Sequence, residues 1–144
     1  MIKVLREQPK HWLTLEICES LFNTFCKDLS FNEPIPLFQT RFSGKLEGTL
    51  YSVSQTFEGK HLKPTILDAA SAYFFYFIKG HPFQNGNKRM GTLFTHYFLL
   101  SHGLTFSLSN EELFALAVGV ALNEKDSITE NEVKDIISSN IKKL

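Results

Sequence analysis

Residues 81–89 read HPFQNGNKR, and this short polar stretch separates two of the most apolar segments of the chain. Residues 64–79 are apolar nearly all round, which predicts a central, buried helix with Pro64 in its first turn. A second apolar helix is expected from about residue 86 to the natural C-terminal stop at Gly103. The stretch is therefore expected at a junction between two buried helices.

The rest of the chain also favours helices. Thr14 is expected to cap a helix that ends near Asp28, and a short helix is expected from Lys45 to about Val53. Two capping boxes, in which a Ser or Thr is followed three residues later by Glu, predict two late helices. The first box is Ser109 with Glu112, before a helix to about Leu122, and the second is Thr129 with Glu132, before a helix with the apolar face Val133, Ile136, Ile137 and Ile141.

Three segments carry no helical pattern. Residues 31–42 are expected to form a loop, because Pro34 and Pro36 break the pattern there. Residues 55–61 are polar with one glycine and are expected to form a hairpin or a loop. Residues 104–108 alternate only weakly and are expected to be a connector. The predicted fold class is all-α with one small hairpin.

Composition narrows the class of protein. The formal net charge is zero and 43% of the residues are hydrophobic, enough for a core without disulfides. Nucleic-acid binders usually carry a basic surplus, so no direct nucleic-acid binding is expected. Cys18 and Cys26 share an apolar helix face and are expected to be reduced core thiols. The first residues lack a secretory signal, and the densest apolar stretch, 69–78, is about half of a membrane span. A cytoplasmic protein that does not bind membranes is expected.

The composition of HPFQNGNKR is typical of an anion site. It precedes a helix, whose first N–H groups are unpaired and whose dipole adds roughly half a positive charge. Gly86 lets several N–H groups point at one place. Lys88 and Arg89 are unfavourable for the helix itself, whereas a bound phosphate would stabilise both. A neutral His81 could then accept the proton of a hydroxyl that attacks phosphorus.

Each of these residues also has an ordinary explanation. The His-Pro pair can form a simple turn, Gly86 can be only a turn residue, and Asn85 or Asn87 can be only a helix cap. The two cations can belong to a solvated helix face. Their occurrence together within nine residues favours a site for phosphoryl or nucleotidyl transfer.

The stretch resembles the signature of the Fic/Doc (Fido) family, His-x-Phe-x-Asp/Glu-Gly/Ala-Asn-Gly/Lys-Arg, at eight of its nine positions. The similarity extends to residues 44–48, GKLEG, and 55–59, QTFEG, which resemble the segment leading into the family's flap hairpin. It covers most of residues 40–124. The resemblance implies a Fido-type helical bundle with a small β-hairpin flap, in a single domain over residues 1–144.

The resemblance also implies an activity and its residues. The family transfers part of a nucleotide, usually AMP from ATP, to a hydroxyl side chain of a target protein. His81 would be the general base. Gly86, Asn87 and the helix start would bind phosphate together with Lys88 and Arg89.

Two further parts of the site follow from the resemblance. The residue at position 85 would normally hold Mg²⁺ for the bound ATP. The flap would pair with an extended segment of the target by strand addition. The expected flap residues are Gln55, Thr56, Phe57 and Glu58.

Two departures from the usual signature favour the Doc branch of the family. Lys88 stands where typical AMP transferases have glycine, and Thr92 stands where many of them have a second arginine. In the Doc branch, ATP is thought to lie reversed, so that the γ-phosphate is transferred to a bacterial elongation factor. The resemblance then implies the toxin of a toxin–antitoxin pair, with a separate antitoxin protein as inhibitor.

The third departure concerns the metal. Asn85 replaces the acidic residue of the signature, and an amide oxygen is a weaker ligand for a hard cation than a carboxylate. Slow activity, a need for high Mg²⁺ and loss of catalysis all remain open. Alternative functions are AMP transfer to a protein hydroxyl and a non-catalytic module that binds a nucleotide or a partner.

Residues 54–59, SQTFEG, also fit the family's inhibitory pattern, Ser/Thr-x-x-x-Glu-Gly/Asn. In that role Glu58 would pair with the second arginine of the signature and block the nucleotide. Because Thr92 stands in place of that arginine, Glu58 is expected to be a flap residue.

Overall fold

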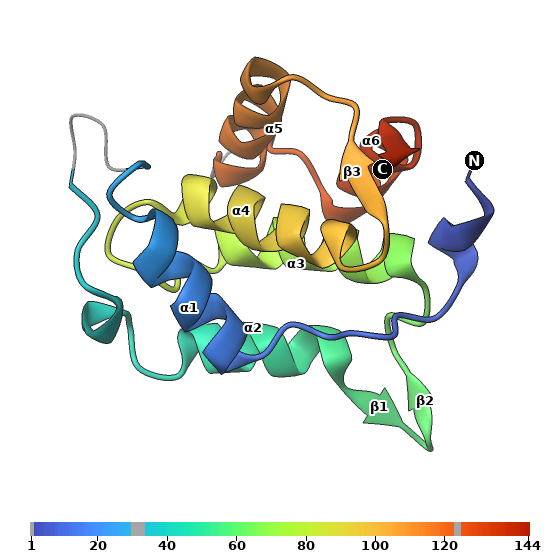
Figure 1. Ribbon diagram of the computed structural model, residues 1–144, viewed down its shortest axis with the longest axis horizontal. Coiled ribbons are helices and arrows are strands. Elements are labelled where there is room, and N and C mark those ends of the chain that lie inside the picture. Colours follow the sequence, from blue (N-terminus) through green and yellow to red (C-terminus); the bar gives the residue numbers. More distant parts are fainter. Residues whose placement is uncertain (1, 30–33, 123–124) are drawn as a thin grey trace.

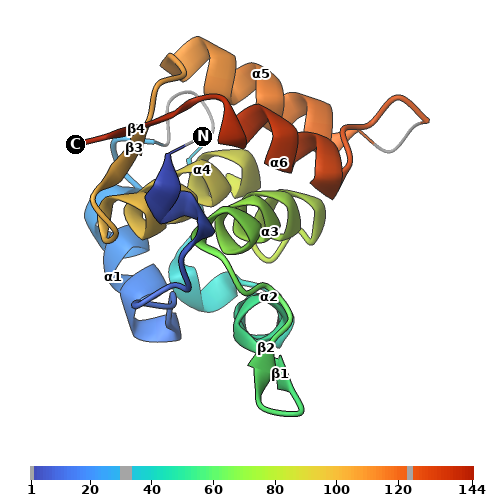
Figure 2. The same ribbon diagram turned by 90° about the vertical axis from the view of Figure 1, so that its right-hand side faces the viewer.

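The computed structural model describes residues 2–29, 34–122 and 125–144, and its helices lie in three layers (Figure 1 and Figure 2). Helices α3 and α4 run side by side through the middle layer, with α1 and α2 on one side and α5 and α6 on the other. The helices, in chain order, are α1 (Leu15–Phe25), α2 (Lys45–Ser54), α3 (Ile66–Lys79), α4 (Asn87–Leu100), α5 (Asn110–Ala121) and α6 (Glu130–Ser138). The 3₁₀ turns are η1 (Lys3–Arg6) and η2 (Phe38–Thr40), and the strands are β1 (Thr56–Phe57), β2 (Lys60–His61), β3 (Leu104–Phe106) and β4 (Ile141–Lys143).

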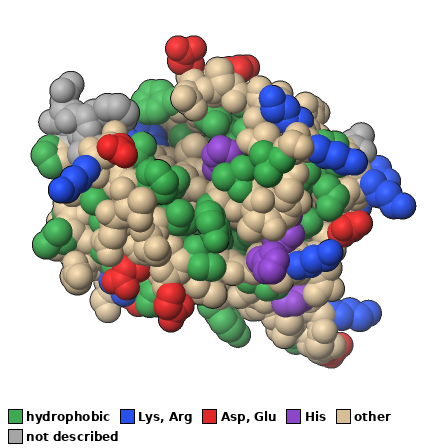
Figure 3. Space-filling model, in the orientation of Figure 1, with side chains coloured by type: hydrophobic (Ala, Val, Ile, Leu, Met, Phe, Trp, Pro, Cys, Tyr) green, Lys and Arg blue, Asp and Glu red, His purple; other side chains and the backbone are tan. Residues whose placement is uncertain are grey.

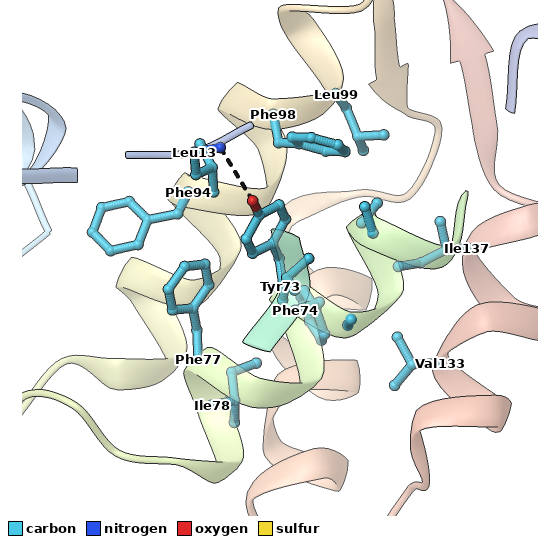
Figure 4. Close-up of a cluster of buried hydrophobic side chains, with 14 of the residues drawn as sticks. Leu13, Tyr73, Phe74, Phe77, Ile78, Phe94, Phe98, Leu99, Val133 and Ile137 are labelled. Atoms are coloured by element: carbon cyan, nitrogen blue, oxygen red, sulfur yellow. Dashed lines mark hydrogen bonds between the residues drawn. The ribbon is translucent and has the colours of Figure 1, made fainter. Parts of the chain in front are cut away.

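Helix α3 is the centre of the core, as its all-round apolar pattern predicts. It contacts α2, α4, α5, α6 and η1. Figure 4 shows Tyr73 and Phe77 of α3 facing Phe94 and Phe98 of α4. The Tyr73 hydroxyl is buried and accepts a hydrogen bond from the Leu13 N–H at 3.1 Å. Burial raises the pKa of Tyr73 well above its usual range.

Two boundaries of the central helices differ from the prediction. Pro64 does not lie in the first turn of α3, because the Thr65 side chain caps the helix by accepting the Asp68 N–H at 3.0 Å. The proline therefore precedes the cap, where its fixed φ suits extended chain. Helix α4 ends at Leu100, and Gly103 follows in a left-handed conformation with φ 74°.

The other predicted helix starts are confirmed. Thr14, Ser109 and Thr129 each accept a hydrogen bond from a backbone N–H of the first turn, and the last two form complete capping boxes. Helix α1 ends at Phe25 and continues as turns, whereas the pattern predicts an end near Asp28. Such a difference is typical of frayed helix ends.

The hairpin predicted within residues 55–61 is confirmed as strands β1 and β2. They pair antiparallel, with Thr56 opposite His61 and Phe57 opposite Lys60. Glu58 and Gly59 form the turn with φ values of 52° and 79°. Figure 2 shows the hairpin projecting from the end of α2. The all-α class with a small hairpin is therefore confirmed.

A second strand pair was not predicted. Residues 104–106 form β3 rather than a connector, and they pair antiparallel with β4 at the end of the described chain. Ile141 belongs to β4 and not to the last helix, although it is buried as its apolar pattern indicates. Local pattern misses this pairing because the two strands lie far apart in the sequence and each has only three residues.

The loop predicted over residues 31–42 begins outside the described residues. Its described part, residues 34–42, contains the short 3₁₀ turn η2. Cys18 and Cys26 are not joined in a disulfide, as predicted. Cys18 is buried, which raises its pKa to about 12, whereas Cys26 is only half-buried.

The surface is mixed in character. Figure 3 shows hydrophobic side chains reaching the surface between acidic and basic ones on the visible face. Among the described residues, no helix combines the length and the apolar character needed to cross a membrane.

The segment before α1 joins the end of α4 to the base of the hairpin. His102 accepts the N–H groups of Lys10 and His11 on Nε2, at 2.9 and 3.3 Å. The next residue, Trp12, packs against His61 of β2 in a tilted arrangement with 4.6 Å between the ring centroids. The position of the hairpin therefore depends on a segment anchored to a histidine.

This anchor predicts a pH dependence of stability. Nε2 can accept the two N–H groups only when the His102 ring is neutral, and its Nδ1 proton goes to the Phe98 carbonyl at 2.9 Å. Burial lowers the pKa of His102 below its ordinary value of about 6.5. The unfolded chain then binds a proton first as pH falls, so stability is full above about pH 6.5 and decreases below it.

Urea unfolding between pH 7.5 and pH 5 measures this dependence. We expect His102→Gln to be less stable than the native chain at pH 7.5 and to lose less stability on acidification. Burial also lowers the pKa of His96, so His96 contributes to the pH dependence of stability as well. His96→Gln therefore measures the part of the dependence that His102 does not explain. An unchanged slope in His102→Gln would contradict the assignment.

The close contact of α3 with α4 gives a second prediction. A Cβ on Gly91 would lie 2.9 Å from Ile78 Cγ1 and 3.2 Å from Phe77 Cβ, whereas a Cβ on Gly48 of α2 meets no atom within 4 Å. Gly91→Ala should lower the free energy of unfolding by about 1–3 kcal/mol through overpacking. Gly48→Ala should raise it by roughly 0.5–1 kcal/mol through helix propensity. Equal free energies of unfolding for the two variants in denaturant would contradict a close contact of Gly91 with α3.

Candidate functional site

The turn between α3 and α4 is closed by one buried side chain. Asn87, the first residue of α4, accepts the Phe83 N–H on Oδ1 at 2.8 Å and donates from Nδ2 to the Phe83 carbonyl at 2.9 Å. Both polar ends of the amide are therefore used, and both backbone groups of Phe83 are satisfied. The Asn87 side chain therefore stabilises the turn, whereas the Asn87 backbone N–H is one of the first N–H groups of α4.

The Phe83 side chain fixes the middle of the turn in the core. It is 4% exposed, and its ring centroid lies 5.1 Å from that of Phe22, 6.0 Å from that of Phe38 and 6.1 Å from that of Phe94. These rings come from α1, η2 and α4. Three elements therefore pack against the Phe83 ring and fix the position of the turn.

Two hydrogen bonds also join the turn to residues 34–42. The Pro82 carbonyl accepts the Phe42 N–H at 2.9 Å, and the Gln84 amide donates to the Thr40 carbonyl at 3.0 Å. These bonds are long-range, so no local sequence pattern could have found them. Nothing in the sequence indicated that the Gln84 side chain helps to position the turn.

His81 is held in an unusual backbone conformation at the end of α3. Its φ is 48°, a region that non-glycine residues seldom occupy, and the side chain is exposed. Its Nδ1 lies 3.1 Å from the Lys79 carbonyl oxygen. Because a carbonyl only accepts, Nδ1 must carry the proton in this contact. The neutral ring then presents Nε2 as an acceptor, which is the state a general base requires.

The start of α4 differs from those of α1, α3, α5 and α6, which Thr or Ser side chains cap. Its N-cap is Gly86 with φ 81°, and a glycine has no side chain that could accept a first-turn N–H. A Cβ at Gly86 would lie 2.9 Å from two carbons of Ile35. The glycine is therefore required both by its conformation and by the close contact with Ile35.

Two cations follow this helix start. Lys88 and Arg89 are half-buried, and the Arg89 guanidinium donates to the Leu29 carbonyl at the end of the α1 turn. Both side chains line a cavity of about 480 Å³ between α4 and α5. The Thr92 hydroxyl donates to the Lys88 carbonyl at 2.9 Å at the same wall. A phosphate at the helix start would meet the dipole and these two cations together.

The walls of the α4–α5 cavity are mainly apolar. Leu29, Leu113, Phe114 and Ala117 form these walls, and Asn110 and Glu111 from the first turn of α5 add polar groups. Phe114 is 57% exposed, so one face of its ring is open to solvent. Nothing in the local sequence of α5 indicated this role, because its residues read as an ordinary capped helix.

A second cavity, of about 560 Å³, lies between α2, the hairpin and α3. It includes Gly80, the residue before His81, and Gln55, the residue before β1. Figure 1 shows α2 and α5 on opposite sides of the α3–α4 layer. The two cavities therefore reach the turn from opposite sides of the middle layer.

The residues present do not fit a magnesium site. The Asn85 Oδ1 accepts the Gly86 N–H at 2.8 Å, and its Nδ2 lies 3.5 Å from the Pro34 carbonyl. The neutral oxygen is therefore engaged within the turn, and a carboxylate here would face the Pro34 carbonyl. Over the described ranges, no three His, Cys, Asp or Glu side chains gather as metal ligands. The chain itself offers no anionic ligand at this position.

The structure brings most of the predicted site residues together. His81, Asn85 and Gly86 lie in the turn between α3 and α4, and residues 87–89 form the start of α4, whereas the flap residues lie on and beside the hairpin that follows α2. Gln55 lines the cavity under the hairpin, whereas Thr56, Phe57 and Glu58 are exposed. Phe57 is 68% exposed, which leaves a large apolar side chain open to a partner.

Comparison with models of known protein families gives a match. The model described as the Fic/DOC family matches residues 12–99, which is more than half of the chain. The matched segment runs from the anchor before α1 almost to the end of α4, so it includes the hairpin and the whole turn. No curated protein matches the chain.

The clamp at Asn87 predicts a large loss of stability. Asn87→Ala should lower the free energy of unfolding by about 2–4 kcal/mol, because it leaves a buried N–H and a buried carbonyl without partners. Asn85→Ala, in the half-buried part of the same turn, should lower it by less than about 1 kcal/mol. Denaturant unfolding of both variants measures the difference. Similar losses would mean that the turn does not depend on the clamp.

Proposed function

Because this chain belongs to the Fic/DOC family, we propose that it transfers a phosphoryl group from ATP to a hydroxyl side chain of a target protein. Members of this family are generally protein-modifying transferases that use ATP with Mg²⁺. The observation that supports the proposal is the Nδ1 contact of His81 with the Lys79 carbonyl, because in the neutral ring this contact leaves Nε2 as the acceptor, in the same turn as the glycine that caps α4.

The reaction can be written with groups of this chain. The γ-phosphate of ATP binds at the start of α4, where Gly86, the Asn87 backbone, Lys88 and Arg89 offset its charge. His81 Nε2 takes the proton of the target hydroxyl as the hydroxyl oxygen bonds to the γ-phosphorus. The bond from that phosphorus to the β–γ bridging oxygen breaks, and ADP leaves. Positioning and charge supply most of the catalysis.

The α4–α5 cavity supports an orientation of ATP in which the γ-phosphate lies at the start of α4. Its volume of about 480 Å³ lies within the usual range for small-molecule sites, and its apolar walls with polar groups at Asn110 and Glu111 suit a nucleoside. With the nucleoside there, the phosphate chain would run past Lys88 and Arg89 to the turn. Lys88 in place of the usual glycine agrees with this arrangement, and with membership of the Doc branch.

AMP transfer is the second candidate function, and the cavity under the hairpin favours it. A nucleoside in that cavity would lie beside Gly80 and would bring the α-phosphate, rather than the γ-phosphate, to the start of α4. The third candidate is a non-catalytic module that holds a nucleotide or a partner. The engaged oxygen of Asn85 favours this candidate, since the chain offers no carboxylate for Mg²⁺.

The hairpin is the proposed docking site for the target protein. Its two short strands leave their outer edges unpaired within the described chain, and Phe57 stands exposed at the surface. An extended target segment could add a strand to either edge. We further propose that the protein is the cytoplasmic toxin of a toxin–antitoxin pair and that a separate antitoxin chain inhibits it.

Labelling with ATP tests the activity and its direction. Bacterial lysate is incubated with the protein, Mg²⁺ and ATP labelled on either the α- or the γ-phosphorus. We expect protein-bound label from the γ position only, and none with His81→Ala. His96→Gln is the matched control, since His96 lies within α4, outside the turn and the hairpin, and it should label normally.

Other outcomes select other functions. Label from the α position would contradict phosphoryl transfer and support AMP transfer. Asn85→Asp should increase labelling if the missing carboxylate limits the native chain. Absence of label with both the native chain and Asn85→Asp would contradict an enzyme and leave the binding module.

A further inference from the structure

The cavity between α2, the hairpin and α3 is lined by cations and hydroxyl groups. Its charged lining residues are Lys45 and Lys63, and no acidic side chain lines it among the described residues. Thr49 and Ser52 of α2 also line it. Within the described chain, their hydroxyl groups form no hydrogen bond. The cavity therefore offers donors that the fold does not use.

The two lysines are not equivalent. Lys63 Nζ lies 2.6 Å from Glu130 Oε2, and the Tyr76 hydroxyl donates to the other oxygen of Glu130 at 2.8 Å. This group joins the base of the hairpin to α6, so Glu130 already balances the charge of Lys63. Lys45 lies over the Phe42 ring at 4.9 Å and makes no ion pair in the described part of the chain. Lys45 is therefore the cation of this cavity whose charge can pair with a bound ligand.

The cavity also lies where a target segment would pass. Gln55, at its hairpin end, leads directly into β1, and Gly80, at its other end, leads directly into His81. A segment that pairs with the hairpin and presents a hydroxyl to His81 must cross between these two residues. A side chain close in sequence to that hydroxyl would then point at the cavity.

We propose that this cavity selects the protein substrate by binding an acidic side chain that flanks the modified hydroxyl, with Lys45 as the charge partner and the Thr49 and Ser52 hydroxyl groups as donors. The inference rests on the proposed function and adds a substrate preference to it. The occupant follows from charge, since a carboxylate finds a cation and donors here, whereas a basic side chain would meet Lys45.

Gly48 gives a means of closing the cavity without disturbing the fold. It lines the cavity from α2, and a Cβ built on it meets no atom within 4 Å. A leucine at this position would add a bulky side chain to the lining and leave less room for a substrate side chain. Gly48→Ala, which adds only a methyl group, is the matched control.

Peptide pairs of equal length test the preference. Each pair carries one serine, threonine or tyrosine with either Glu or Gln beside it, and transfer from γ-labelled ATP is measured for both members. With the native chain, we expect about fivefold more label on the Glu peptide, near the upper limit for one partly exposed ion pair. Lys45→Gln should remove the preference, and Lys142→Gln, an exposed lysine on β4, should keep it.

A second arm measures binding without ATP, by fluorescence anisotropy of the same peptides carrying a dye. Gly48→Leu should weaken binding of the Glu peptide, whereas Gly48→Ala should change it less. This arm separates the inference from the proposed function. A Glu preference in binding without any transfer would support the cavity and contradict the transferase.

The remaining outcomes overturn the inference. Equal labelling of both members of each pair, or a preference that persists in Lys45→Gln, would leave the transferase intact and remove the role of the cavity. Stronger labelling of the Gln peptide would do the same. Neither binding nor transfer with any pair would contradict both proposals.

Discussion

The hydrogen bonds between the Asn87 amide and the backbone of Phe83 determine the shape of the whole site. They join the middle of the turn to the first residue of α4, so that α4 can begin at residue 87 immediately after the turn. With the turn closed, the Phe83 ring is buried and Gly86 takes the conformation that starts α4. The position of His81 relative to the helix start then depends on α3, whose last residues are fixed in the core.

A closed turn between two cavities suggests a division of roles. The cavity between α4 and α5 is mainly apolar and lies beside Lys88 and Arg89, which suits a phosphate donor with a nucleoside. The cavity between α2 and α3 carries lysines and hydroxyl groups, which suits a segment of a protein substrate. In this account the donor and the acceptor approach from opposite sides of the α3–α4 layer and meet at the turn. The segment anchored by His102 packs against the base of the hairpin, which is the proposed docking site.

The sequence predicted those features that depend on neighbouring residues. Capping residues such as Thr14 and Ser109 located the helices, and Gly86 with the two cations that follow it predicted an anion site. Features that join segments far apart in the sequence could not be predicted from it. The pairing of β3 with β4, the contact of Ile35 with Gly86 and both cavities arise from tertiary packing, which local pattern does not encode. Asn85 was recognised as a departure from the family signature, but its bond to the Gly86 N–H appears only in the structure.

The central claim is that the start of α4 binds the phosphate groups of the donor. The most direct measurement is the change in backbone amide resonances when a non-hydrolysable ATP analogue is added, with and without Mg²⁺. The account predicts that the largest changes occur at Gly86, Asn87 and Lys88, and that they persist without Mg²⁺ because the chain offers no carboxylate at position 85. Changes confined to other parts of the chain, with the start of α4 unaffected, would contradict it.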